Sequence, residues 1–414
     1  MFSRIVNLSK ILGKTSSGLF LGARGLGKTH MSEQWLAKQD FRLSYNLLDT
    51  YEFKRLLTNP SQMKAEVEEK LATLKTGGVL SVLIDEVQKV PDLLDVAHLL
   101  IEQHKNKVRF LLTGSSARKL KSKSANLLAS RALSIRLYPF TSYELKAHRF
   151  NLLTALRFGT VPAIITAEQK ELALRSYVDT YLKEEIQQEA LVRKLDKFFS
   201  FIDVAAQLNG EVVNFSKMAR QLSLADKTIG DYFQILIDTL LVIKVNGWDR
   251  SAKKQIIKSP KFYFFDCGVL NAAAKELNLS LEAGSARYGR LFETFIITEI
   301  HRLNDYFSLD YSLAFYSTGA SEVDLVLSRS RSEEPIAIEI KSNPTVCRED
   351  LPGLELFGNE YPKSELYCLS TNSNPYSITL LSGKKVAVLP YEEGILTVLG
   401  LDPQKVILPH SPAT

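Results

Sequence analysis

The sequence predicts an α/β protein of several domains, with a parallel sheet at the N-terminal end and a second α/β unit at the C-terminal end. Short apolar runs alternate with helical segments over residues 17–145, which is typical of a parallel α/β sheet. The apolar period becomes helical from about 141 to 245, and strand-like runs return from about 285 to 400. At 414 residues, the chain also exceeds the length that one hydrophobic core usually supports.

The composition is that of an ordinary globular protein. Apolar residues make up 45% and charged residues 24% of the chain, so extensive disorder is not expected. The formal net charge of +6 is compatible with a nucleic-acid partner but too small to demand one. Three scattered cysteines fit a reducing compartment: Cys267, Cys347 and Cys368. Because no apolar run approaches the ~20 residues that span a bilayer and no secretion signal is visible, we expect a cytoplasmic protein without a membrane partner.

Five strand candidates define a first predicted domain, residues 1–145. They are residues 17–22, 41–48, 79–85, 108–114 and 132–140, and helical stretches lie between them. Thr141 and Glu144 form a capping-box pattern, which predicts that a helix begins just past the last strand.

A glycine-rich stretch follows the first strand and opens a helix, which is the context in which such a stretch binds phosphate. It satisfies G-x-x-x-x-G-K-T with Gly22, Ala23, Arg24, Gly25, Leu26, Gly27, Lys28 and Thr29. The glycines allow backbone N–H groups to wrap a phosphate at the positive end of the helix. Lys28 is expected to reach the β- and γ-phosphates and Thr29 to ligate Mg²⁺. The alternative is a glycine-rich turn that arose by chance.

Acidic and polar residues end two of the later strands of this domain. Asp85 and Glu86 end the strand 79–85, where Asp85 would hold the magnesium shell and Glu86 would activate water. Thr113 or Ser115, at the end of the next strand, would sense the γ-phosphate, and the sequence does not choose between them. Together with the glycine-rich stretch, these residues predict a site for ATP and Mg²⁺.

Arg131 lies just before the strand 132–140. In ring-forming ATPases an arginine at this place reaches the γ-phosphate of a neighbouring subunit, so Arg131 predicts a homo-oligomer. The alternative is a solvated arginine or a local salt bridge. A basic run close by would touch a polyanion or form a solvated face: Arg118, Lys119, Lys121 and Lys123.

The middle of the chain predicts a helical connector, residues 146–200, and a winged helix-turn-helix, residues 201–266. Two helical segments at 215–224 and 227–241 are separated by a very short turn, and two strand-like runs follow around a basic loop. Basic and hydroxyl side chains in this region would meet DNA phosphates: Lys217, Arg220, Lys227, Thr228, Lys253, Lys254 and Lys258. The second helix also carries Asp226, Asp231 and Asp238, so a module used only for domain packing is an open alternative.

The last predicted domain, residues 267–405, contains a D…E-x-K pattern on two neighbouring strands. Alternation places Glu339 and Lys341 on one face of their strand, with Ile340 turned to the core, and Asp324 lies on the preceding strand. The carboxylates of Asp324 and Glu339 would hold a second Mg²⁺ or Mn²⁺, Lys341 would position water, and Glu293 would be an accessory acid. An exposed E-x-K on an edge strand is the alternative.

These motifs, taken in order, resemble those of prokaryotic AAA+ ATPases that carry a C-terminal domain of unknown function. The resemblance spans nearly the whole chain, through residues 84–91, 111–116, 129–132, 158–162, 181–186, 289–293, 322–324 and 339–341. The usual double glycine of the turn at 158–162 is broken here by Thr160. The resemblance implies an AAA+ core, a winged helix and a restriction-endonuclease-like end domain, but no settled cellular role.

Two functional hypotheses follow. In the first, ATP binding and hydrolysis in an oligomeric core drive a C-terminal half that binds or cleaves DNA. In the second, the chain is a nucleotide-gated switch or scaffold for a protein partner, and its endonuclease-like domain is degenerate. A small-molecule kinase would use the same glycine-rich motif, but it needs a lid with clustered arginines, which the sequence does not contain.

Overall fold

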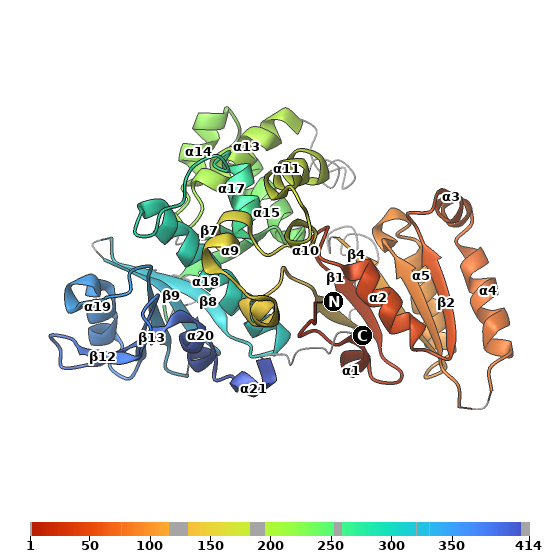
Figure 1. Ribbon diagram of the computed structural model, residues 1–414. Coiled ribbons are helices and arrows are strands. Elements are labelled where there is room, and N and C mark those ends of the chain that lie inside the picture. Colours follow the sequence, from red (N-terminus) through yellow and green to blue (C-terminus); the bar gives the residue numbers. More distant parts are fainter. Residues whose placement is uncertain are drawn as a thin grey trace.

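The computed structural model describes residues 2–75, 77–115, 131–182, 195–251, 259–319, 321–330 and 332–406. The chain forms an N-terminal sheet with its helices, a C-terminal sheet with its helices, and a group of helices that lies above the space between the two (Figure 1). In the described part of the chain, no helix is long and apolar enough to cross a membrane.

The N-terminal sheet contains five parallel strands in the order β2-β3-β4-β1-β5. All five strands fall within predicted runs: β1 (Ser17–Leu21), β2 (Phe41–Asn46), β3 (Leu80–Asp85), β4 (Val108–Gly114) and β5 (Ala132–Arg136). Every residue of β3 and β4 is buried, as expected for central strands that are covered on both faces. The parallel α/β sheet predicted from the sequence is therefore confirmed.

Helices cover this sheet and continue beyond it. They are α1 (Leu8–Leu12), α2 (Lys28–Ala37), α3 (Thr50–Thr58), α4 (Ser61–Ala72) and α5 (Leu93–Gln103), with a 3₁₀ turn η1 at Val87–Lys89. Past β5, α8 (Ser142–Leu145) begins with the predicted capping box: Thr141 Oγ1 accepts from the N–H of Glu144, and the Glu144 carboxylate accepts from the N–H of Thr141.

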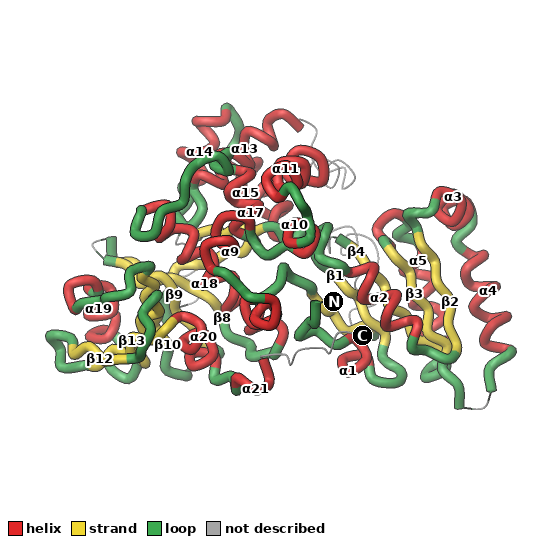
Figure 2. Tube along the Cα trace, in the orientation of Figure 1, coloured by secondary structure: helices red, strands yellow, loops and turns green. Residues whose placement is uncertain are grey.

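The helical group of Figure 2 combines two stretches of sequence. The first contains η2 (Lys146–His148), α9 (Leu152–Phe158), α10 (Pro162–Ile165), α11 (Lys170–Ser176) and a π-helical turn η3 (Tyr177–Leu182). The second contains α13 (Leu195–Gln207), α14 (Phe215–Leu222), α15 (Asp226–Asp238) and α17 (Cys267–Ala273). A short turn joins α14 to α15, as predicted, and Ser223 adopts a left-handed conformation there (φ 52°). Stacked rings hold α15 on the strand β7 (Lys261–Phe264), with the centroids of Phe233 and Phe262 3.8 Å apart.

The hairpin after α15 belongs to the C-terminal sheet. Strand β6 (Val242–Gly247) pairs antiparallel with β7 (Lys261–Phe264), and its end pairs parallel with β8 (Ser312–Ser317). The resulting eight-stranded sheet has the order β12-β13-β11-β10-β9-β8-β6-β7. The helix-turn-helix segment and the C-terminal domain therefore share one sheet.

The C-terminal part runs in the order helix, three strands, helix, strand. It begins with α18 (Ala286–Tyr306), followed by β8, β9 (Glu322–Ser328), β10 (Ile336–Lys341), the 3₁₀ turn η4 (Arg348–Asp350), α19 (Pro352–Glu360) and β11 (Glu365–Ser370). The predicted closing hairpin is β12 (Tyr376–Thr379) with β13 (Lys385–Pro390), and α20 (Tyr391–Leu399) and α21 (Pro403–Val406) follow it. Strands β8, β9 and β10 form an antiparallel meander, and β11 lies parallel to β10.

Candidate functional site

The glycine-rich loop lies between β1 and α2, and its backbone requires glycine at all three glycine positions. Gly25 and Gly27 have φ values of 80° and 90°, a region that residues with a side chain rarely adopt. A Cβ at Gly22 would lie 2.6 Å from the carbonyl oxygen of Leu137. The loop backbone is thus shaped for phosphate, with α2 beginning at Lys28 directly behind it.

Lys28 is buried, and its ammonium group lies inside this loop. Its Nζ donates to the carbonyl oxygens of Gly22 at 2.7 Å and of Ala23 at 3.1 Å. These contacts keep a positive charge in the loop where phosphate oxygens would be received.

A row of hydrogen bonds joins three of the predicted residues, from the first turn of α2 to the C-terminal ends of β3 and β4. Thr29 Oγ1 donates to Asp85 Oδ2 at 2.9 Å, and Thr113 Oγ1 donates to the other carboxylate oxygen, Oδ1. Thr113 Oγ1 also accepts from the backbone N–H of Glu86 at 3.0 Å. Asp85 and Thr113 are buried, so the row is fixed at the C-terminal edge of the sheet.

Glu86 and Ser115 meet through Gln88, a residue that sequence reasoning missed. Gln88 Nε2 donates both to the Glu86 carboxylate and to Ser115 Oγ, the latter at 3.1 Å. Glu86 is in the left-handed region (φ 61°), where a residue with a side chain is strained, and such strain is typical of functional sites. Thr113 thus contacts Asp85, whereas Ser115 contacts the group that holds Glu86.

The turn and helices after residue 158 pack directly on the glycine-rich loop. Tyr177 Oη donates to the carbonyl oxygen of Arg24 at 3.0 Å, and the N–H of Ala163 donates to that of Gly25 at 3.3 Å. A Cβ at Gly25 would lie 3.2 Å from the Cβ of Ala163. No local sequence signal marks these contacts, because the partners are far apart in the chain.

A buried polar network, centred on Arg302 of α18, lies where the parts of the protein meet. The Arg302 guanidinium donates to the carbonyl oxygens of Phe140 at 2.9 Å and Phe265 at 2.6 Å, and it pairs with Glu299 at 3.0 Å. Glu299 in turn accepts from the N–H and hydroxyl of Ser142 at 2.8 and 2.7 Å. Burial raises the pKa of Glu299, and Arg302 opposes this shift. This junction network links the first domain, the hairpin and α18.

Asp266 extends the junction network to the turn at 158–162. Its carboxylate accepts from the N–H of Thr160 at 2.6 Å and caps α17 by accepting from Gly268 at 2.9 Å. A Cβ on Gly159 would lie 1.9 Å from the Asp266 carboxylate, so only glycine fits there. The Oγ1 of Thr160 accepts a hydrogen bond from the Arg302 guanidinium at 3.2 Å.

In the C-terminal sheet, the predicted D…E-x-K residues lie where two strands separate. The β9–β10 ladder ends at the pair Leu325 and Ile338, and beyond it Asp324 Oδ2 accepts from the N–H of Ile340 at 2.7 Å. Glu339 and Lys341 do share a face, since their side chains form an ion pair at 2.8 Å. Glu339 is 6% exposed, and its Oε2 has no hydrogen-bond partner among the described residues.

Two further carboxylates and two side chains of β7 complete this group. Tyr263 Oη donates to Glu293 Oε1 at 2.7 Å, and Lys261 forms an ion pair with Glu322. We name the whole group the acidic centre: Glu293, Glu322, Asp324 and Glu339 with Lys261, Tyr263 and Lys341. Among the described residues, no group of three or more His, Cys, Asp or Glu side chains is arranged to hold a metal ion. The sequence had not predicted Lys261, Tyr263 or Glu322 at this site.

Burial and like charge shift the titration of the acidic centre. Burial, together with the neighbouring charge of Asp324, raises the pKa of Glu293 to about 7. Burial likewise raises the pKa values of Asp324 and Glu339. Burial opposes the charge of Lys261, but Glu293 and Glu322 nevertheless raise its pKa, so the ammonium form is retained. The centre is thus a crowded set of carboxylates held together by lysines.

The exposed surface of the helix-turn-helix segment carries mixed charge. On α15, exposed positions include Asp226, Lys227, Asp231 and Gln234, so acids outnumber bases there. The predicted contacts Lys217 and Arg220 lie on α14 and are exposed. Two further groups of predicted phosphate contacts fall outside the described residues, the loop lysines Lys253, Lys254 and Lys258 and the basic run Arg118, Lys119, Lys121 and Lys123.

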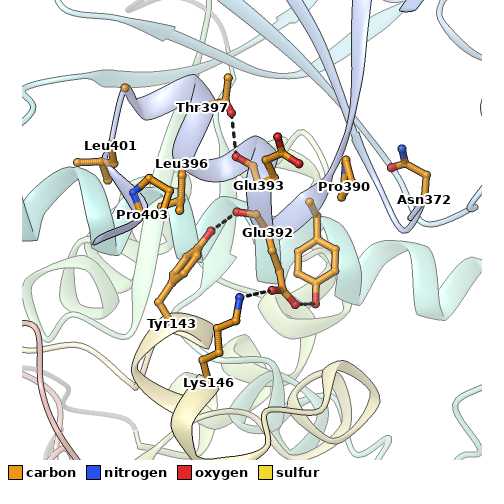
Figure 3. A pocket seen from close by; sticks show the side chains of 12 residues that line it. Tyr143, Lys146, Asn372, Pro390, Glu392, Glu393, Leu396, Thr397, Leu401 and Pro403 are labelled. Atoms are coloured by element: carbon orange, nitrogen blue, oxygen red, sulfur yellow. Dashed lines mark hydrogen bonds and ion pairs between the residues drawn. The ribbon is translucent and has the colours of Figure 1, made fainter. Parts of the chain in front are cut away.

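Arg131 lies directly before β5, and its Nε forms an ion pair with Glu102 of α5 at 2.5 Å. A separate pocket of about 570 Å³ lies between α8 and α20, and it contains none of the predicted site residues (Figure 3). There, Tyr143 Oη donates to the carbonyl oxygen of Glu392 at 2.6 Å, and Lys146 pairs with the Glu392 carboxylate at 3.4 Å. These contacts tie the end of the first domain to the C-terminal helices.

Three protein-family descriptions match consecutive parts of the chain. Residues 16–146 match an AAA domain, residues 149–281 match a domain of unknown function (DUF8612), and residues 288–392 match another domain of unknown function (DUF4143). The first match and the nucleotide-site geometry confirm an AAA-type P-loop core. The last confirms that a C-terminal domain of unknown function follows it.

Relatives and solved structures are more distant. Uncharacterised proteins of Mycobacterium tuberculosis and Mycobacterium bovis are each 25% identical over 70% of this chain, and the match spans 65% of their own length. One of Haemophilus influenzae is 22% identical over 76% of this chain and 79% of its own length. Among solved structures, Aeropyrum pernix ORC1 in complex with DNA is similar at 12% identity and a TM-score of 0.30, over 65% of this chain and 90% of that chain. Aeropyrum pernix ORC2 is similar at 13% identity and a TM-score of 0.33, over 65% and 89%.

Proposed function

We propose that this protein is a Mg²⁺-dependent ATPase of the AAA+ type that transmits its nucleotide state to a DNA-engaging C-terminal half. The observation that carries the ATPase part is the row of hydrogen bonds from Thr29 through Asp85 to Thr113, with Glu86 beside it. The start of α2, directly after the glycine-rich loop, and the ends of β3 and β4 converge on these few atoms, and such convergence is what phosphoryl-transfer chemistry requires.

Each residue of the nucleotide site has a defined role. Lys28 contacts the β- and γ-phosphates, and Glu86 orients and activates the attacking water. Thr29 and Asp85 would hold Mg²⁺, and their hydroxyl and carboxylate oxygens suit that ion, which would neutralise phosphate charge when bound. Release of Glu86 from Gln88 frees its carboxylate for water.

The coupling runs through the turn at 158–162. At one end of the segment from Thr160 to Ala163, the N–H of Ala163 donates to the carbonyl oxygen of Gly25 in the glycine-rich loop. At the other end, the N–H of Thr160 donates to the Asp266 carboxylate. Asp266 lies two residues past the end of β7, the strand that carries Lys261 and Tyr263 into the acidic centre. A shift of the loop on nucleotide binding therefore has a continuous packed route to the C-terminal sheet.

The C-terminal half is proposed to bind or cleave DNA. Helices α14 and α15 with the β6–β7 hairpin act as a winged helix, and the order helix, three strands, helix, strand supports a restriction-endonuclease-like fold. The domains on this view are 1–145, 146–200, 201–266 and 267–405. In the acidic centre, Asp324 and Glu339 would hold Mg²⁺ or Mn²⁺, Lys341 positions water, and Glu293 is the accessory acid. The unpartnered, buried Oε2 of Glu339 supports a cation there.

The proposal includes a homo-oligomer in which Arg131 reaches the γ-phosphate bound to a neighbouring subunit. Arg131 is exposed directly before β5, and the Glu102 side chain that pairs with it is 39% exposed, so this ion pair contributes little stability. An ATPase rate per subunit that rises with protein concentration, and is lost in Arg131→Ala, would be the expected sign.

A second candidate function is a nucleotide-gated switch or scaffold for a protein partner, with a degenerate nuclease domain. The acidic exposed face of α15 favours it, because Asp226 and Asp231 would repel DNA phosphates. Phosphate contacts make DNA binding steeply salt-dependent, so salt-sensitive binding at physiological ionic strength would count against this candidate.

The deciding experiment is a divalent-metal titration of the full chain with and without ATP, on single-stranded, duplex and branched DNA. Wild type, Lys28→Ala and Lys341→Ala are compared for ATP hydrolysis, DNA binding and cleavage. We expect Lys28→Ala to lose hydrolysis and nucleotide-dependent DNA binding, and Lys341→Ala to lose cleavage alone. If both variants bind and cleave DNA as wild type does, the DNA part of the proposal is wrong.

A further inference from the structure

The acidic centre has two halves, each with its own lysine. In one half, Lys341 pairs with Glu339 next to Asp324. In the other half, Lys261 pairs with Glu322, and Tyr263, two residues further along β7, donates to Glu293. The two halves meet on β9, where Glu322 and Asp324 are two residues apart and therefore share a face of the strand.

The two lysines differ in their freedom to move. The Lys341 side chain is 33% exposed and reaches solvent, whereas the Lys261 side chain is 4% exposed. Lys261 is also anchored from a second side, since its Nζ lies 5.1 Å from the ring centroid of Phe315. An ammonium group so enclosed acts as a fixed internal cation of the centre.

The charges balance for one divalent cation. The four carboxylates of the centre face two ammonium groups, which leaves two negative charges in excess when all are ionised. A single divalent ion neutralises them, whereas a second ion would place excess positive charge beside the buried Lys261. In the other half, the buried Oε2 of Glu339 has no hydrogen-bond partner among the described residues, so this oxygen can bind a cation.

We propose that Lys261 is the resident cation of the Glu293–Glu322 half, so that the acidic centre takes a single divalent cation, at Asp324 and Glu339. This inference rests on the metal centre of the proposed function. Lys261 and Tyr263 engage two of the four carboxylates. The inference therefore also explains why no three acids among the described residues are arranged to share a metal ion.

The test is Mn²⁺ binding to the full chain without nucleotide, measured by calorimetry and by electron paramagnetic resonance of the free ion. Every protein carries Asp85→Asn, so that the nucleotide site does not contribute. The background protein is expected to bind one Mn²⁺, and Lys261→Met to bind two, or one at least about tenfold more tightly. Lys261→Arg, which keeps the charge, should bind one with nearly unchanged affinity.

The outcomes separate the inference from the proposed function. The inference is overturned if the background protein binds one Mn²⁺, this ion is lost in Asp324→Asn, and a folded Lys261→Met binds Mn²⁺ with unchanged stoichiometry and affinity. The metal centre of the proposed function then still stands. Two Mn²⁺ ions in the background protein also overturn the inference. No Mn²⁺ in any of the folded proteins overturns both the inference and the metal centre. Lys261→Gln replaces Lys261→Met if circular dichroism shows that the latter does not fold.

Discussion

Replacing Asp266 by asparagine should separate the turn at 158–162 from the C-terminal sheet. Asp266 is 1% exposed, and one carboxylate oxygen accepts from the N–H of Thr160 while the other accepts from Gly268 and Val269. The asparagine oxygen can keep the helix cap of α17, because asparagine and aspartate cap equally well. Its NH₂ group then faces the N–H of Thr160, and two donors cannot satisfy each other.

The magnitude follows from that buried N–H. An unsatisfied buried donor costs roughly 1–3 kcal/mol, and a hydrogen bond to a charged group contributes roughly 1.5–3 kcal/mol. Since both describe largely the same lost bond, we expect a loss of about 1.5–3 kcal/mol in the free energy of unfolding. That is a sizeable share of the 5–15 kcal/mol typical of a folded domain.

Urea unfolding gives the stability, and amide hydrogen exchange of residues 158–163 gives the local effect. The matched control is Asp203→Asn, which breaks a solvent-exposed ion pair with Lys275 and should cost less than about 1 kcal/mol. Exchange at 158–163 should accelerate in Asp266→Asn but not in the control. If the two variants lose the same stability and protect these amides equally, Asp266 does not fix the turn and the proposed route is wrong.

Two further predictions concern titration and turnover. Burial lowers the pKa of His301 to about 4, so its neutral form stabilises the fold above the unfolded pKa of about 6.5, and this contribution is lost as the pH falls from there towards 4. Between pH 7.5 and 5, the free energy of unfolding from thermal melts should therefore fall by roughly 1–3 kcal/mol less in His301→Gln than in wild type. An equal fall in the two proteins contradicts the assignment. Thr113→Val removes the hydroxyl shared by Asp85 and Glu86, so ATP turnover should fall about tenfold or more in a steady-state assay, with nucleotide affinity changed much less, whereas an unchanged turnover would exclude a role for Thr113.

Local patterns in the sequence were sufficient for the elements and for part of the site. The strands of the first domain alternate or are apolar in runs, and the capping box at Thr141 is a motif of four residues, so both could be identified without tertiary knowledge. The shared face of Glu339 and Lys341 follows from the period of two in a strand. The glycine-rich loop was recognisable because strand, glycines and helix are contiguous.

Long-range contacts left no such pattern. Arg302 contacts Phe140 and Phe265, which lie 162 and 37 residues away in the sequence, and each of these residues alone looks like an ordinary member of a helix or strand. Lys261 reads as the first residue of a strand next to a basic loop, and only the parallel pairing of β6 with β8 brings its strand into the C-terminal sheet. Non-local pairing of this kind is not encoded in local periodicity.

Calorimetry of ATP binding to the full chain tests the central claim most directly, namely that the loop from Gly22 to Thr29 binds a triphosphate together with Asp85. We predict uptake of ATP that requires Mg²⁺ and is weakened about tenfold or more by Lys28→Ala, because a charged hydrogen bond contributes roughly 1.5–3 kcal/mol. The account would be contradicted if no ATP binding were detected. It would also be contradicted if the folded Lys28→Ala variant bound ATP as tightly as wild type does and a chelator did not weaken binding.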